Sequence, residues 1–147
     1  MSERSVGDSR FVVPASVADA CRATAAAAEV ALRCAETLED ALASMSPRSA
    51  QNARECIDAC HDAFTVLTAG SVMLERPPHA ARMAAIRRIL EAGLVAAVEC
   101  AAQCELWVDD QPAAGECAGQ CHSCADVLRA ALRDVAEETT DEMSGAT

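Results

Sequence analysis

The stretch CAGQCHSC, residues 117–124, indicates how the last third of this 147-residue chain folds. Its cysteines, Cys117, Cys121 and Cys124, are separated by four and then by three residues. Residues at these spacings are neighbours on one face of an α-helix, whereas a zinc ribbon would place turn residues between paired cysteines. The stretch therefore predicts a helix that carries a stripe of thiols along one face.

Prolines predict where the helices begin. Proline is tolerated in the first turn of a helix but not deeper, and each proline position here precedes a long alanine-rich stretch. These positions are Pro14, Pro47, Pro77-Pro78 and Pro112. Ser46 is a suitable N-cap for the second helix, and Ser16 with Asp19 resembles a capping box for the first.

We therefore predict an all-α protein with one domain at 14–138. The helices are expected at 15–45, 48–75, 78–109 and 113–138, with disordered segments at 1–13 and 139–147. Short connections force neighbouring helices to be antiparallel, so the expected architecture is an up-down-up-down four-helix bundle. Apolar residues make up 52% of the chain but aromatic residues only 2%, which favours a core of small side chains and disfavours a β-sandwich.

Eight of the nine cysteines are expected in one half of this bundle. The turns near 45–48 and 109–113 are expected at the same height along the bundle axis, and each helical residue adds about 1.5 Å along that axis. The cysteines then form three layers: Cys104 with Cys117, then Cys56 with Cys100 and Cys121, then Cys34 with Cys60 and Cys124. Cys21 falls near the opposite end. A convergence of this kind favours metal binding over plain packing, although a free cysteine is also a well-buried hydrophobe.

Charge favours Cu(I) as the metal. A Cu⁺ ion that replaces a thiol proton leaves the site neutral, whereas four thiolates around Zn²⁺ or around an iron–sulfur cluster leave a net negative charge in the core. An iron–sulfur or zinc site on a subset of the same cysteines is the alternative. A third class is a thiol redox protein, for which Cys117 in the first turns of the last helix is the best candidate.

Other functions are disfavoured by composition. The net charge of −11 argues against a nucleic-acid partner. No stretch is apolar for long enough to cross a membrane, and the start of the chain has no signal-peptide pattern, so we expect a cytosolic protein with reduced thiols. We find no catalytic motif and expect no enzymatic activity.

The motifs CIDAC (56–60), CAAQC (100–104) and CAGQCHSCA (117–125) resemble those of the bacterial four-helix-bundle copper storage proteins. The resemblance covers most of 15–138 and implies a cytosolic Cu(I) reservoir with a role in copper homeostasis. It also implies a homo-tetramer into which copper passes through one open end near His or Met residues. A copper chaperone is a candidate delivery partner. Seven ligands match by motif and Cys34 by its layer; the seven are Cys56, Cys60, Cys100, Cys104, Cys117, Cys121 and Cys124.

The stripe of thiols is shorter here than the resemblance implies. Aliphatic residues stand where further cysteines would be expected, namely Ala63, Leu67, Leu90, Ala97 and Leu128. We therefore expect a lower capacity, in the form of a single multinuclear Cu(I)–thiolate cluster. Storage, sensing and delivery all stay open at this point.

A few other soft side chains were considered as points where copper enters or as weak ligands. Near the thiol-rich end these are Met45, His61 and His122, and near the other end they are Cys21, Met73, His79 and Met83. The alternative for each is an ordinary surface or core position. Trp107 is expected to plug the top layer or to pack at a subunit contact.

Overall fold

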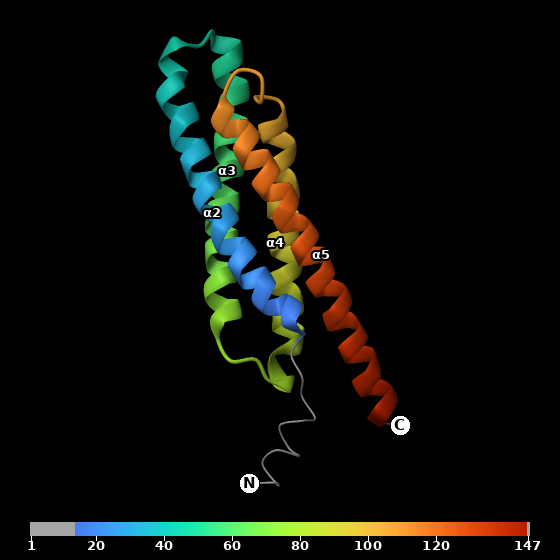
Figure 1. Ribbon diagram of the computed structural model, residues 1–147. Helices are drawn as coiled ribbons and strands as arrows, with labels where there is room; N and C mark the ends of the chain where they lie inside the picture. Colours follow the sequence, from blue (N-terminus) through green and yellow to red (C-terminus); the bar gives the residue numbers. More distant parts are fainter. Residues whose placement is uncertain (1–13, 147) are drawn as a thin grey trace.

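The structure is a computed structural model that describes the backbone of residues 14–146 and the side chains of residues 14–136. Within this range the chain is an all-α four-helix bundle, as predicted (Figure 1). The long helices are α2 (Ala15–Ala41), α3 (Pro47–Glu75), α4 (Met83–Glu105) and α5 (Pro112–Ala146), and two short 3-10 turns are η1 (Leu42–Ser44) and η2 (Ala80–Arg82).

The four long helices form a ring of antiparallel neighbours. Helix α2 packs against α3 and α5, and α4 packs against the same two helices, whereas α2 and α4 lie diagonally across the core with little contact. The α2–α3 and α4–α5 connections lie at one end of the bundle, and the α3–α4 connection lies at the other (Figure 1). We call the first the upper end and the second the lower end.

Of the two capping signals predicted from the sequence, one is confirmed and one is wrong. The Ser49 amide donates to the Ser46 hydroxyl at 3.2 Å, which confirms Ser46 as the N-cap of α3. The predicted capping box of Ser16 and Asp19 is wrong, because α2 has no side-chain cap. The Ser16 hydroxyl instead donates to the Asp134 carboxylate at 2.6 Å and so joins α2 to α5.

Four predicted boundaries need correction. The first helix ends at Ala41 and not at residue 45, because the 3-10 turn η1 follows it, and the third helix ends at Glu105 and not at residue 109. The third helix does not begin at residue 78, because His79 is extended after the proline pair and a 3-10 turn precedes Met83. The last helix continues past residue 138 to Ala146, so the predicted disordered tail is helical over 139–146, a range that has no proline and no glycine before Gly145. The predicted disorder of 1–13 lies outside the described residues.

The core changes character along the bundle axis. Its upper half is rich in cysteine and alanine, with Leu38 as a large aliphatic residue near the end, and its lower half contains fully buried aliphatic residues such as Leu67, Leu90 and Leu128. Gly93 lies among them, and a Cβ added to it would meet Leu128 Cδ1 at 3.4 Å, an ordinary van der Waals contact. Among the described residues, Thr24 is the one buried polar side chain, and its hydroxyl donates to the Ala20 carbonyl at 2.9 Å.

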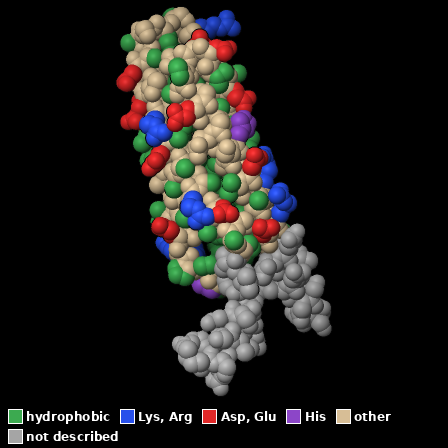
Figure 2. All heavy atoms as spheres, in the orientation of Figure 1, with side chains coloured by type: hydrophobic (Ala, Val, Ile, Leu, Met, Phe, Trp, Pro, Cys, Tyr) green, Lys and Arg blue, Asp and Glu red, His purple; other side chains and the backbone are tan. Residues whose placement is uncertain are grey.

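The outer surface is mixed in charge. Acidic and basic side chains are scattered over the face seen in Figure 2, and hydrophobic side chains lie between them. A search of the described helices for one long and apolar enough to cross a membrane finds none.

Candidate metal centre

Seven buried thiols from all four helices meet in the upper half of the core. We call these seven residues the thiol cluster: Cys34 of α2, Cys56 and Cys60 of α3, Cys100 and Cys104 of α4, and Cys117 and Cys121 of α5. Each is at most 1% exposed. They converge because each lies on the inward seam of its helix, where apolar or small residues recur every three or four positions.

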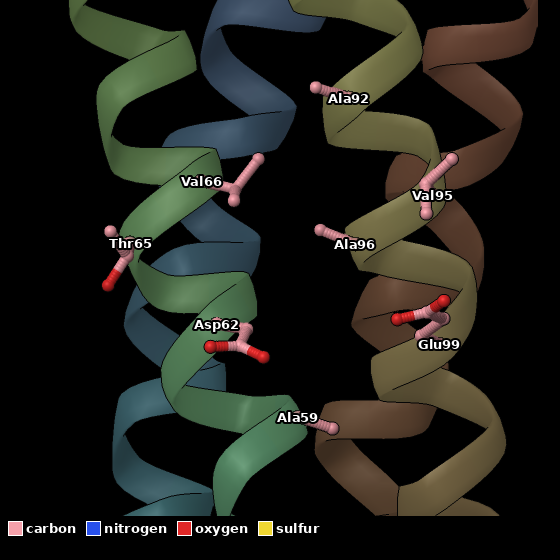
Figure 3. Close-up of a pocket in the computed structure, with 8 residues that line it drawn as sticks. All are labelled: Ala59, Asp62, Thr65, Val66, Ala92, Val95, Ala96 and Glu99. Atoms are coloured by element: carbon pink, nitrogen blue, oxygen red, sulfur yellow. The ribbon is translucent and has the colours of Figure 1, made fainter.

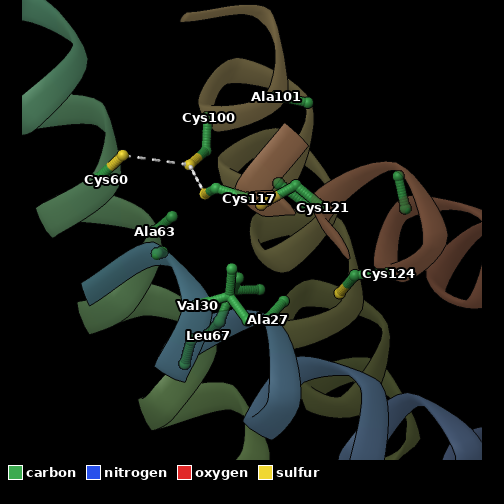
Figure 4. Packing of buried hydrophobic residues seen from close by; sticks show 14 of the residues in the cluster. Ala27, Val30, Cys60, Ala63, Leu67, Cys100, Ala101, Cys117, Cys121 and Cys124 are labelled. Carbon is green, nitrogen blue, oxygen red and sulfur yellow. Dashed lines mark hydrogen bonds between the residues drawn. The ribbon is translucent and has the colours of Figure 1, made fainter. Parts of the chain in front are cut away.

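Cys104 is the central member of the thiol cluster. Its Sγ lies 3.6 Å from that of Cys60, 3.9 Å from those of Cys34 and Cys56, and 4.0 Å from that of Cys100. Cys100 extends the network, with its Sγ 3.7 Å from Cys60 and 3.6 Å from Cys117 (Figure 4). Six of the seven sulfurs therefore form a connected network across helix boundaries, and the sulfur of Cys121 lies within 4.8 Å of those of Cys100 and Cys117.

Two groups within the thiol cluster have the spacing of metal ligands. The Sγ atoms of one group lie within 4.8 Å of one another, and so do those of the other; the groups are Cys34, Cys60, Cys104 and Cys117, and Cys100, Cys117 and Cys121. A metal–sulfur bond of about 2.3 Å separates ligand sulfurs by roughly 3.8 Å in a tetrahedron and roughly 4.0 Å in a trigonal plane. The sulfurs are thus already close to the spacing that a shared ion requires.

The layers predicted from sequence are not the ones observed. Cys104 and Cys117 were expected a turn or more above Cys34 and Cys60, yet the four sulfurs are grouped together. The reason is that the α2–α3 pair extends farther up than the α4–α5 connection (Figure 1), so the two turns are not level. The cysteines of α4 and α5 therefore lie closer to the lower end than predicted, relative to those of α2 and α3.

Two cysteines stand apart from the thiol cluster. Cys124, predicted as a ligand, is buried one turn below Cys121, makes no sulfur–sulfur contact with another described cysteine and lies away from the contacting sulfurs in Figure 4. Burial raises its pKa to about 11. Cys21 is half-buried near the lower end, where its thiol donates to the Ser71 carbonyl at 3.3 Å. Burial raises the pKa of Cys21 as well.

Hydrogen bonds divide the protons of the thiol cluster unevenly. A bond from Cys104 is the main cause that lowers the pKa of Cys100, to about 5. The bond to Cys100 is the first cause that raises the pKa of Cys104. For Cys34 the bond from Cys104 favours the thiolate, but contacts with Cys117 and Cys56 outweigh it and raise the pKa to about 12. The sulfurs therefore share protons, some accepting S–H bonds and others donating them.

The core around the thiol cluster contains no positive charge. Every Arg and His side chain among the described residues is at least partly exposed, and the one buried polar residue, Thr24, is hydrogen-bonded to its own helix. A site that gained several negative charges would therefore have no nearby cation to offset them.

The histidines considered as points where copper enters lie on the surface. His61 Nε2 is 2.9 Å from the Glu39 carboxylate, and His122 Nε2 contacts the Glu105 carboxylate, all four side chains being exposed. Histidine side chains are accordingly visible on the outer surface in Figure 2. Neither ring is part of a metal-ligand group in the described part of the chain.

The remaining soft side chains do not gather into a site either. Met45 packs partly buried against the core after η1, Met83 is buried at the start of α4, and Met73 is 37% exposed on α3. His79 precedes η2, and its carbonyl accepts from the Arg82 amide. No ligand group found among the described residues includes any of them.

Sequence reasoning did not anticipate the polar cavity outside Trp107. A cavity of about 400 Å³ lies between the upper ends of α3 and α4, and Trp107 contributes to its wall. The indole is 9% exposed, and its Nε1–H is buried with no hydrogen-bond partner. One feature of the sequence pointed to this location: Trp107 follows Cys104 by three residues, so it is expected on the same inward stripe, beside the thiols.

A second hollow lies lower on the same side of the bundle, between α3 and α4 (Figure 3). It is a groove of about 500 Å³ with a mostly small and apolar lining. Asp62 and Glu99 stand on its opposite walls, and no cysteine or histidine lines it. The groove has no soft ligands, so it is not a part of the metal centre.

Comparison of the chain with protein-family models, with curated proteins and with solved structures gives no match. The functional argument therefore depends on the geometry and chemistry of the thiol cluster.

Proposed function

We propose that this protein binds and sequesters Cu(I) through the thiolates of its core, in one multinuclear cluster. The observation that carries the proposal is the thiol cluster itself: six of its buried thiols are linked by sulfur–sulfur contacts of 3.6 to 4.0 Å, and Cys121 lies within 4.8 Å of two of them. The resemblance of the cysteine motifs to bacterial copper storage proteins agrees with it. Copper is the cargo here, and the cysteines are its ligands.

The balance of charge favours Cu(I) over Zn²⁺. Each Cu⁺ that replaces a thiol proton leaves the net charge of the core unchanged. A zinc ion held by the four-thiol group would carry a net charge of about −2 into a region without a buried cation. Soft thiolates bind either ion, so the ligands themselves do not discriminate between them. The uncharged surroundings of the thiol cluster are what favour the monovalent ion.

The spacing disfavours an iron–sulfur cluster. Such a cluster holds sulfide and iron between its cysteine ligands, and each of the cysteines binds iron at the outside of the inorganic core. The ligand sulfurs must then stand well apart, whereas the sulfurs of Cys60, Cys100 and Cys104 are in direct contact. Ions that share bridging sulfurs fit the observed contacts better.

The test is an anaerobic titration of the reduced protein with Cu(I) in the presence of a competing chelator. We expect saturation at several ions per chain, an ultraviolet thiolate-to-copper band, and little change in net charge on native electrophoresis. Parallel titrations with Zn²⁺ and Fe²⁺ plus sulfide test the alternatives. Saturation at a single Cu(I), or loss of all copper to the chelator, would refute sequestration.

Cys21 provides a matched control for the titration. It is a cysteine of the same bundle that makes its hydrogen bond to a backbone carbonyl and belongs to no thiol group in the described chain. Cys21→Ser should leave the copper number unchanged, whereas Cys100→Ser and Cys121→Ser should lower it. Equal losses in all three variants would indicate binding to dispersed thiols.

The proposal extends to a cytosolic location, a homo-tetramer and loading by a copper chaperone. A reducing compartment keeps thiols available for metal. Cell fractionation tests the location, sedimentation velocity tests the assembly, and transfer from Cu(I)-loaded chaperones tests the delivery.

A further inference from the structure

The thiol cluster is closed along the bundle axis in both directions. Toward the lower end, the fully buried side chains of Leu67, Leu90 and Leu128 fill the core. Toward the upper end, Leu38 is fully buried one turn beyond Cys34, and Leu42 and Met45 pack over the same region. A copper ion travelling along the axis would have to pass one of these hydrophobic layers.

Trp107 stands at the side of the thiol cluster and differs from these aliphatic side chains. It lies in the turn that follows α4, three residues after Cys104, and its amide donates to the Cys104 carbonyl at 2.9 Å. The Trp107 carbonyl accepts from the amides of Asp110 and Gln111, at 3.1 and 2.8 Å. The backbone is therefore held on both sides, so that movement at this position is confined to the indole.

The indole is the one described side chain with a buried and unpartnered polar nitrogen or oxygen. A buried donor without an acceptor costs free energy relative to one that is hydrogen-bonded. A rotation that turns the ring outward would bring Nε1–H to the cavity of about 400 Å³. Acceptors are available there, because the wall includes Asn52, Glu55 and Gln103.

We propose that this cavity is the port through which Cu(I) reaches the thiol cluster, with Trp107 as its gate. This inference rests on the proposed function. The Glu55 and Asp110 carboxylates give the cavity a negative potential that attracts a monovalent cation. Glu55 and Gln103 of the cavity wall are the sequence neighbours of Cys56 and Cys104, so the cavity lies at the same height along α3 and α4 as the upper edge of the cluster.

Each transfer through the port is an exchange of a copper ion for a proton. A chelated Cu(I) loses its bonds to the chelator and forms a bond to a cysteine sulfur, whose S–H bond breaks. The oxidation state of copper does not change. The proton leaves by the same route, to a carboxylate of the cavity and then to water.

The test measures how fast the protein takes Cu(I) from a chromophoric chelator, by anaerobic stopped-flow absorbance. Trp107→Ala removes the gate and should speed uptake at least tenfold without changing the final copper number. Asn52→Phe places a ring in the cavity from an exposed position and should slow uptake severalfold. Leu74→Ala is the matched control, a truncation of a buried side chain at the lower end that should leave the rate unchanged.

Rates and copper numbers separate the two hypotheses. Equal acceleration by Trp107→Ala and Leu74→Ala would show that general loosening of the bundle admits copper, which overturns the port. An unchanged rate in Asn52→Phe would overturn it as well. If either of these results comes with a normal copper number, the port is refuted but the proposed function is not. A wild-type protein that binds no Cu(I) at equilibrium refutes both the port and the proposed function.

Discussion

Replacing Cys104, the central thiol of the cluster, should lower the number of bound copper ions by far more than one seventh. Among the described residues, six sulfur–sulfur pairs are in hydrogen-bonding contact at 3.6 to 4.0 Å, and Cys104 takes part in four of them. If each contact corresponds to one bridged ion, Cys104→Ser leaves two contacts and lowers the copper number by about two thirds. If the seven cysteines bind independently, the loss is about one seventh.

The assay is the anaerobic Cu(I) titration with a competing chelator, carried out on Cys104→Ser, Cys104→Ala and the wild type. A buried serine hydroxyl needs a hydrogen-bond partner, which the carbonyl four residues earlier in a helix can provide. Circular dichroism on heating checks that both variants are folded at the titration temperature. A loss near one seventh in folded variants would refute the network of bridging sulfurs.

Three further changes test the fold and the burial of the thiols. Leu90→Ala should lower the free energy of unfolding by about 2–5 kcal/mol, because it leaves a cavity in the lower core, and a denaturant titration that shows less than about 1 kcal/mol would contradict the packing described. Ser46→Ala should cost about 1 kcal/mol through loss of the N-cap of α3, measured by thermal unfolding with the exposed Ser44→Ala as the control. The pKa of the Cys124 thiol is about 11 in the folded chain, above the ordinary value of 9.0, so the folded state holds this proton more tightly. Stability should therefore fall as pH rises from 9.0 to about 11, by up to about 3 kcal/mol from this group, and Cys124→Ala should reduce that fall. An identical pH dependence in both proteins would show that Cys124 is not buried.

The fold was accessible from sequence because its signals are local. Proline at the first helical turn, Ser46 as an N-cap and the spacing of apolar residues each act within a few residues of the chain. Boundaries failed where a nonlocal contact or the absence of a breaker decided the outcome. Ser16 bonds to Asp134, far along the chain, and α5 continues because nothing in residues 139–144 interrupts it.

The burial of the candidate ligands was predicted from the sequence, but their arrangement was not, and Cys124 stands apart from the other seven. Helical periodicity places the cysteines on the inward faces, and burial of all eight upper cysteines confirms that part. The vertical offset between the two helix pairs depends on packing across the bundle, so spacing along each helix could not reveal that Cys104 is central or that Cys124 is set apart. The unpartnered nitrogen of Trp107 depends on its surroundings in three dimensions and has no signature in the sequence beyond its position.

The core is divided into a thiol half and an aliphatic half, so under the proposed function the number of copper ions would depend on how many helical turns carry cysteine. The inward seams continue without interruption from the thiol cluster to Leu67, Leu90 and Leu128, all fully buried. Each further turn of cysteines along these seams would add ligands without a change of topology, while each turn of leucine adds cohesion. In a bundle of fixed length, each turn given to cysteine is one turn fewer of leucine. The proposed copper number and the stability of the core therefore change in opposite directions, and this chain contains turns of both kinds.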